Sequence, residues 1–212
     1  MRMRKKKHTD DRLLACGELF YDAPTVLRGK WNTLSGGRPL FLEIGCGKGT
    51  FVCETARRHP ENFYIAIEKV RDVLVMAIEK VKEAGLSNVL FSDIDAERLT
   101  DVFADGELAG IYLNFSDPWP KKKHAGRRFV NPDNLKEVYR VLKTGGLFRI
   151  ATDHPVYKRH VLRTMHQDAG FIWTAKCGED WKREPADWVR TKYQQKAVRE
   201  GRRPVFFDYR KI

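Results

Sequence analysis

From residue 40 onward, short apolar runs alternate with segments in which apolar residues recur at helical spacing. Strands separated by helices become parallel strands joined by right-handed crossovers. We therefore predict an α/β fold with a doubly wound, mostly parallel sheet that binds ligands at the carboxyl ends of its strands. Strands are expected at residues 40–44, 63–67, 89–91, 110–115, 147–151, 171–175 and 205–209, and helices at 50–59, 70–84, 132–144 and 156–169.

The first part of the chain differs from the rest. It opens with five Lys or Arg residues within positions 1–7 and then carries only scattered apolar residues. The Ser-Gly-Gly-Arg-Pro sequence at 35–39 is typical of a loop. We therefore divide the chain into a basic N-terminal extension, residues 1–35, and one main domain, residues 36–212.

The charge of the chain indicates its class of partner. Lys plus Arg number 40 against 28 Asp plus Glu, which gives a formal net charge of +12. Proteins this basic often bind a polyanion. No apolar run approaches the roughly 18 residues of a membrane span, and no apolar stretch follows the basic start as in a signal peptide. The four cysteines form no Cys-x-x-Cys pair, so no metal site is expected. We therefore expect a cytoplasmic protein that binds nucleic acid.

A glycine-rich loop joins the first expected strand to the first helix. Its glycines alternate, at Gly45, Gly47 and Gly49, and Glu43 precedes them by two residues. Alternate glycines allow close backbone approach to a ligand. A dinucleotide loop usually reads G-x-G-x-x-G, and the Glu43 carboxylate would repel a pyrophosphate but accept hydrogen bonds from an ammonium group. The loop therefore favours S-adenosylmethionine, which has an α-ammonium and no phosphate, over a nicotinamide cofactor.

Further carboxylates follow the next two expected strands. Glu68 ends the second strand, where a carboxylate can hold ribose hydroxyls. Asp93 and Asp95 follow the third strand, where an adenine could be held. We expect only one of these two to point into the site, and either could instead cap the next helix.

A loop with two prolines follows the fourth expected strand. It begins with Asp117 and ends in a cluster of basic residues. Prolines stiffen the loop, and the cations behind them suit RNA phosphates. The candidate RNA-binding residues are Lys122, Lys123, His124, Arg127 and Arg128.

These motifs together resemble those of the bacterial tRNA (guanine-N7-)-methyltransferase family, over essentially the whole chain. The matching stretches are Glu-Ile-Gly-Cys-Gly-Lys-Gly at 43–49, Asp-Pro-Trp-Pro-Lys-Lys-Lys-His at 117–124, Ala-Thr-Asp at 151–153 and Thr-Lys-Tyr at 191–193. The resemblance implies the Rossmann-like fold of a class I S-adenosylmethionine-dependent methyltransferase. It also implies that the substrate is a guanine in the variable loop of tRNA.

The resemblance implies roles for individual residues. Glu43, Glu68, Asp95 and Asp117 would line the cofactor site, together with Gly45 and Gly47 of the loop, and Asp117 would be catalytic. Lys121, Asp153, Thr191, Lys192, Tyr193 and Gln194 would face the guanine or its nucleotide. The family usually has Glu where this chain has Gln194, which offers only one acceptor oxygen to the two adjacent donors of guanine's Watson–Crick edge.

Two other function classes remain as alternatives. Methyltransferases of exocyclic amines use an acidic or amide residue followed by Pro-Pro-aromatic, whereas here the aromatic Trp119 comes one place early. A non-catalytic RNA-binding protein on the same fold would not require Glu43, Glu68 and Asp117. The sequence leaves the oligomeric state open between monomer and homodimer.

Overall fold

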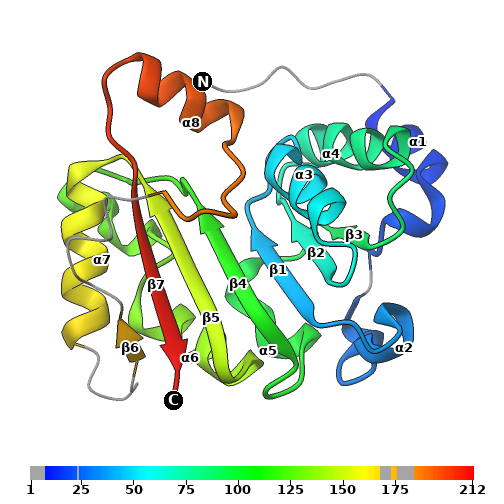
Figure 1. Ribbon diagram of the computed structural model, residues 1–212, viewed down its shortest axis with the longest axis horizontal. Coiled ribbons are helices and arrows are strands. Elements are labelled where there is room, and N and C mark those ends of the chain that lie inside the picture. The colour runs from blue at the N-terminus through cyan, green and yellow to red at the C-terminus, as the bar shows by residue number, and fades with distance from the viewer. Residues whose placement is uncertain (1–7, 23, 168–172, 176–183) are drawn as a thin grey trace.

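A computed structural model describes residues 8–22, 24–167, 173–175 and 184–212 of the chain (Figure 1). These residues form a seven-stranded sheet with the strand order β3-β2-β1-β4-β5-β7-β6. Strands β1 to β5 pair in parallel, and β7 runs antiparallel between β5 and β6, so the predicted doubly wound, mostly parallel sheet is confirmed. The strands are β1 Leu40–Ile44, β2 Phe63–Ile67, β3 Val89–Ser92, β4 Leu108–Asn114, β5 Leu142–Thr152, β6 Trp173–Ala175 and β7 Val205–Lys211.

Helices cover both faces of the sheet. In the described residues they are α1 Thr9–Ala15, α2 Trp31–Ser35, α3 Thr50–Arg58, α4 Arg71–Glu83, α5 Leu99–Val102, α6 Pro132–Val141, α7 Pro155–Gln167 and α8 Lys192–Arg199. One buried apolar cluster joins α5, α6 and α7 to one face, and a second joins α3 and α4 to the other. Burial on both faces explains why the central strands read as continuous apolar runs.

One predicted helix boundary is wrong. The expected helix at 132–144 begins as predicted, with Asn131 accepting a hydrogen bond from the Asn134 backbone N–H and Pro132 in the first turn. It ends at Val141, because Leu142 adopts an extended backbone and pairs with Leu108 as the first residue of β5. Leu142 is fully buried, and an apolar residue at this position fits both the helical spacing and the start of a strand, so apolar spacing alone does not distinguish the two.

The expected strand at 171–175 and helix at 156–169 are only partly described. Residues 173–175 form β6, and α7 is described to Gln167. Residues 168–172 lie outside the described part of the chain.

The segment before residue 36 packs closely against the sheet domain. Trp31 is 1% exposed, and its indole nitrogen donates to the Val102 carbonyl at 2.9 Å while its ring stacks on Phe103. In α1, Arg12 makes two hydrogen bonds to Glu79 of α4, at 2.8 and 2.6 Å. The described segments that hold α1 and α2 therefore pack against the sheet domain, and the basic positions 1–7 lie outside the described residues.

Helix α8 crosses the carboxyl-terminal edge of the sheet, above the ends of β4 and β5 in Figure 1. The sequence pattern does not predict this helix. Thr191 caps it by accepting a hydrogen bond from the Gln194 backbone N–H at 3.0 Å. This cap places the 191–194 stretch over the edge at which a doubly wound sheet binds its ligands.

Candidate cofactor and substrate site

A cavity of about 430 Å³ opens at the carboxyl ends of β1 and β4, beneath α8. It brings together three parts of the chain that are distant in the sequence: the glycine loop, the end of β4 and the start of α8. Its lining consists of Glu43, Gly45, Cys46, Gly47, Lys48, Thr50, Phe51, Asn114, Phe115, Thr191, Lys192, Tyr193 and Lys196.

The glycine loop presents bare backbone to this cavity. Gly45 and Gly47 have φ of 71° and 54°, in the left-handed region that favours glycine, and a Cβ on either would meet open space. Gly49 serves a different purpose, since a Cβ there would lie 2.7 Å from the Cβ of Ala77 in α4. The loop thus leaves room for a ligand at its first two glycines and lets two helices approach at the third.

Glu43 lies at the floor of the cavity and is almost fully buried, at 2% exposure. Its Oε1 accepts a hydrogen bond from the Asn114 side-chain nitrogen at 3.0 Å, whereas no described group donates to its Oε2. Burial raises the pKa of Glu43 from an ordinary 4.5 to about 7, against the opposing effects of the Asn114 hydrogen bond and the nearby Val52 backbone N–H. A buried carboxylate with a free oxygen is expected to bind a cationic donor.

Glu68 lies directly after β2 and is half-buried. Its Oε2 accepts from the Gly47 backbone N–H at 3.2 Å, and its Oε1 accepts from the Val70 N–H at 3.0 Å. The carboxylate therefore joins the glycine loop to the start of α4. This is the position at which a ribose would meet a carboxylate in the predicted site.

The two candidates after β3 are both paired. Asp95 accepts from Lys69 at 2.7 Å and caps the short 3₁₀ helix Ala96–Arg98 through the Glu97 N–H at 3.2 Å. Asp93 accepts from Arg71 at 2.6 Å. Asp95 borders a separate cavity of about 300 Å³. The capping role that the sequence left open thus belongs to Asp95.

The loop after β4 is held in a strained conformation. Phe115 and Trp119 have positive φ values of 53° and 39°, which are costly for residues with bulky side chains. Arg128, only 6% exposed, braces this loop by donating to the Pro118 carbonyl at 3.1 Å and the Trp119 carbonyl at 2.9 Å. Asp117 is exposed on the braced loop, three residues beyond the cavity-lining Asn114.

The basic residues of this loop fall into two groups. Lys121, Lys122, Lys123 and Arg127 are exposed, and the Arg127 guanidinium lies 5.0 Å from the centre of the Trp119 ring. His124 also contacts that ring edge-on. Arg128 is buried and engaged with carbonyls, as described above. The exposed cations are therefore free to meet a ligand, whereas Arg128 stabilises the loop from inside.

Asp153 follows β5, and its charge is balanced by an ion pair with a neighbouring arginine. Its side chain is 4% exposed, forms an ion pair with Arg202 and accepts from the Tyr193 hydroxyl at 3.3 Å. The Arg202 guanidinium also lies 5.3 Å from the centre of the Tyr193 ring. These contacts tie α8 and the residues after it to the end of β5, and they hold Tyr193 in the cavity lining.

Gln194 does not face the cavity. It is 1% exposed, its Oε1 accepts from the Trp188 indole nitrogen at 2.7 Å, and its Nε2 donates to Glu184 at 2.8 Å. Because an indole N–H can only donate and a carboxylate only accept, this orientation of the amide is fixed. The three neighbours Thr191, Lys192 and Tyr193 line the cavity, whereas Gln194 anchors α8 from beneath.

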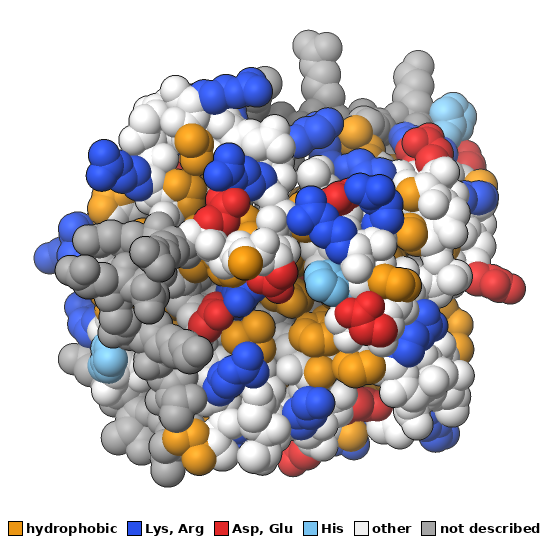
Figure 2. All heavy atoms as spheres, in the orientation of Figure 1, with side chains coloured by type: hydrophobic (Ala, Val, Ile, Leu, Met, Phe, Trp, Pro, Cys, Tyr) orange, Lys and Arg blue, Asp and Glu red, His pale blue; other side chains and the backbone are white. Residues whose placement is uncertain are grey.

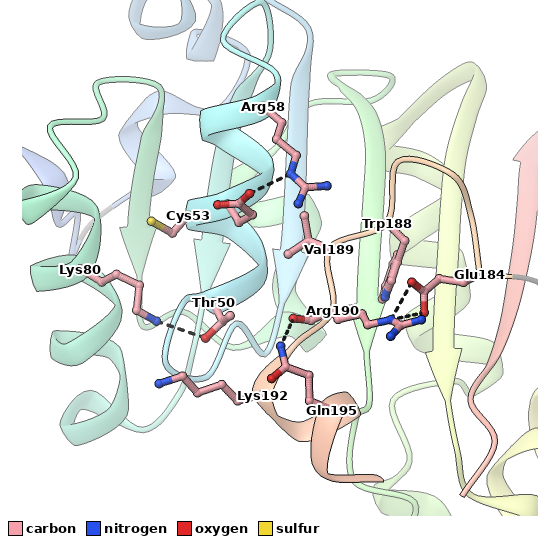
Figure 3. A pocket seen from close by; sticks show the side chains of 11 residues that line it. Thr50, Cys53, Arg58, Lys80, Glu184, Trp188, Val189, Arg190, Lys192 and Gln195 are labelled. Atoms are coloured by element: carbon pink, nitrogen blue, oxygen red, sulfur yellow. Dashed lines mark hydrogen bonds and ion pairs between the residues drawn. The ribbon is translucent and has the colours of Figure 1, made fainter. Parts of the chain in front are cut away.

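A second pocket of about 530 Å³ adjoins the first and shares Thr50 and Lys192 with it (Figure 3). Lys80 of α4 donates to Thr50 Oγ1 at 3.2 Å and to the Lys48 carbonyl. Burial lowers the pKa of Lys80, and the ammonium group of Lys192 lowers it further. The pocket wall thus holds two amines near each other, and neither pairs with a carboxylate in the described residues.

Basic side chains gather on the surface near the site. Lys and Arg side chains gather over the part of the visible face that holds α8, α3 and α4 (Figure 2). No helix within the described residues is long and apolar enough to span a membrane. The same residues contain no group of three His, Cys, Asp or Glu side chains placed to hold a metal ion.

The structure thus brings Glu43, Gly45 and Gly47 together with three residues of the 191–194 stretch around one cavity. Glu68 adjoins them through the glycine loop, whereas Asp95 and Asp153 border other cavities. Asn114, which lines the cavity and donates a hydrogen bond to Glu43, is not among the residues predicted from the sequence. Its position as a polar residue at the end of a buried strand was the available signal.

Known proteins resemble this chain over most of its length. A family model described as "Putative methyltransferase" matches residues 37–206. A tRNA (guanine-N(7)-)-methyltransferase of Ruegeria pomeroyi is 39% identical over 193 residues, which are 91% of this chain and 81% of that protein. Another from Geobacillus thermodenitrificans is 39% identical over 204 residues, or 96% of this chain and 94% of that protein.

Among solved structures, the 16S rRNA methyltransferase KamB matches with a TM-score of 0.62 at 18% identity, over 87% of this chain and 93% of that one. At this identity the likeness concerns the fold alone.

Proposed function

Because this chain belongs to the tRNA (guanine-N(7)-)-methyltransferase family, we propose that it transfers a methyl group from S-adenosylmethionine to N7 of a guanine in the tRNA variable loop. The observation that carries the proposal is the cavity in which a buried carboxylate meets an open glycine backbone. A tRNA substrate also accounts for the net charge of +12 and implies a cytoplasmic enzyme.

The residues of the cavity fit this cofactor. The free Oε2 of Glu43 suits its α-ammonium, and the open space at Gly45 and Gly47 allows close backbone approach. Glu68 is assigned to the ribose hydroxyls. Asp95 is assigned to the adenine amino group, for which it would exchange its surface ion pair with Lys69, an interaction of low net energy.

The cofactor supplies a methyl group on a sulfonium, and the protein supplies alignment. Guanine N7 has an in-plane lone pair and no proton, so no residue has to act as a base before the attack. The chain must instead hold N7 in line with the methyl carbon. Methylation makes the purine cationic, and the exposed carboxylate of Asp117, on its braced loop, can stabilise that charge or orient the base through its amino group.

Substrate contacts are assigned to the residues around the mouth of the cavity. Lys121 and the Thr191, Lys192 and Tyr193 stretch would meet the nucleotide, with Asp153 positioning Tyr193. The exposed Lys122, Lys123 and Arg127 and the partly buried His124 would meet phosphates, as would Lys192 from the adjoining pocket. We assign Arg128 and Gln194 to supporting these contacts from inside the protein.

The identity of the product tests the proposal. The protein is incubated with bulk tRNA and S-adenosylmethionine, and the RNA is treated with borohydride and then aniline. N7 methylation makes the imidazole ring labile, so we expect one new cleavage, in the variable loop, that requires both enzyme and cofactor. A methylated product that resists cleavage would indicate an exocyclic amine as the target instead. Binding of tRNA without any methylation would indicate a non-catalytic protein.

A further inference from the structure

Two buried oxygen atoms at the floor of the cofactor cavity have no hydrogen-bond donor among the described residues. One is Oε2 of Glu43 and the other is Oδ1 of Asn114. Both side chains are more than nine-tenths buried, and both line the same cavity. Buried acceptors are nearly always paired, because desolvation without a partner is costly, so two such atoms together indicate an absent donor.

The hydrogen bond between the two side chains fixes which atoms remain free. Asn114 donates its amide nitrogen to Glu43 Oε1 at 3.0 Å. Rotating the amide by half a turn would set its oxygen against the carboxylate, so this orientation is the favourable one. Each side chain is therefore left with one acceptor, and the two acceptors belong to one hydrogen-bonded pair at the carboxyl ends of the adjacent strands β1 and β4.

A primary ammonium group matches this arrangement, since it carries positive charge and three N–H donors. We propose that Asn114 is a cofactor-binding residue, whose Oδ1 shares the α-ammonium of S-adenosylmethionine with Oε2 of Glu43. The inference rests on the proposed function and adds a second acceptor to the carboxylate. Asn114 in this view both orients Glu43 and contacts the cofactor directly.

Binding of the ammonium is coupled to a proton. The pKa of Glu43 is raised to about 7, chiefly by burial and to a smaller extent by Glu68 after β2, while the hydrogen bond from Asn114 and the charge of Lys80 of α4 oppose the rise. Near pH 7 a substantial part of the free protein therefore carries a protonated Glu43. The ammonium favours the charged carboxylate, so the protonated fraction releases its proton to the solvent as the ligand binds.

Calorimetry on the full chain tests the contact. The ligands are S-adenosylhomocysteine, which does not react, and its analogue in which hydrogen replaces the α-amino group. We expect Asn114→Leu to weaken the binding of S-adenosylhomocysteine by about tenfold, as for loss of a hydrogen bond to a charged group. The same change should weaken binding of the analogue by less than about twofold. Asn62→Leu, the same change just before β2 and away from the cavity, should alter neither affinity.

Proton release provides a readout independent of the variant. Repeating the wild-type titrations in buffers of different ionisation enthalpy should show net proton release on binding of S-adenosylhomocysteine near pH 7, and less release as the pH rises above the pKa of Glu43. The analogue should release none. Asn114→Ser serves as a smaller substitution if the leucine variant does not fold.

The possible outcomes separate this inference from the proposed function. If the Asn114 variants weakened the binding of both ligands equally, the inference would be overturned, because the residue would then affect only the shape of the cavity. Wild-type protein that binds both ligands equally and releases no proton would overturn it as well, while leaving the cofactor assignment in place. Failure to bind S-adenosylhomocysteine at all would instead refute the proposed function.

Discussion

The side-chain oxygen of Gln194 lies 2.7 Å from the indole nitrogen of Trp188, in a site that is closed to solvent. On its other side, the Gln194 amide nitrogen donates to Glu184 at 2.8 Å. An amide satisfies both neighbours at once, because one is only a donor and the other only an acceptor. This accounts for an amide at a position where the family usually has glutamate. Here the side chain anchors α8, and a glutamate would place a second carboxylate beside that of Glu184.

The first prediction follows from this pairing. Gln194→Glu should destabilise the protein by about 1–3 kcal/mol, because a donor to Glu184 is replaced by a second carboxylate oxygen. Denaturant unfolding measures the change. Gln195→Glu, on the exposed side of the same helix, is the matched control and should change stability by less than about 0.5 kcal/mol. Adding Glu184→Gln to the Gln194→Glu variant should restore much of the loss, and equal stability of all these proteins would contradict the assigned contact.

The second prediction concerns the pH dependence of stability. Burial raises the pKa of Glu43 from 4.5 to about 7, so its contribution to stability is complete below pH 4.5 and is lost as the pH rises through 7. Without ligand, the unfolding free energy of the wild type relative to Glu43→Gln should therefore fall by up to about 3 kcal/mol over this range. Unfolding of both proteins at several pH values gives this difference. A difference that is constant with pH would show that Glu43 titrates normally.

Much of the fold could be predicted because local pattern and global arrangement agree. The strands β1 and β2 are short apolar runs that are buried on both faces, and the loop signals between elements lie where chain reversals occur. The end of α6 could not be predicted, since Leu142 suits both the helical spacing and the strand. Helix α8 was missed because its residues are mostly exposed and polar, with only Gln194 and Ala197 buried.

The site was predictable where it depends on strand ends. Parallel strands bring their carboxyl ends to one edge, so Glu43 and the glycine loop could be placed at one cavity from the sequence. Contacts between distant segments could not be foreseen in the same way. The burial of Arg128 depends on carbonyls of a strained loop, and the neutralisation of Asp153 depends on Arg202, 49 positions further along the chain.

The third prediction concerns Asp117. Asp117→Ala should slow single-turnover methyl transfer by about tenfold or more, since the carboxylate is proposed to meet the reacting base. Asp117→Asn keeps an acceptor for the guanine amino group and removes the charge, so a slow Asn variant would favour charge stabilisation over orientation. Asp133→Ala, at an exposed position in the first turn of α6, is the control and should react at the wild-type rate. An Asp117→Ala rate within about threefold of wild type, or roughly 0.7 kcal/mol, would exclude a catalytic role.

The last prediction separates phosphate contacts from bracing within one loop. Lys122 and Lys123 are exposed, so changing both to Ala should weaken tRNA binding and reduce the slope of log K against log salt by up to about 1.8, as for two lost phosphate contacts. Arg128→Ala removes hydrogen bonds to the Pro118 and Trp119 carbonyls, so it should slow methyl transfer through the displaced loop and leave that slope nearly unchanged. Filter binding across a salt series, with single-turnover rates on the same proteins, measures both effects. A larger loss of slope in the Arg128 variant than in the double lysine variant would reverse the two assignments, because only a phosphate contact responds to salt in this way.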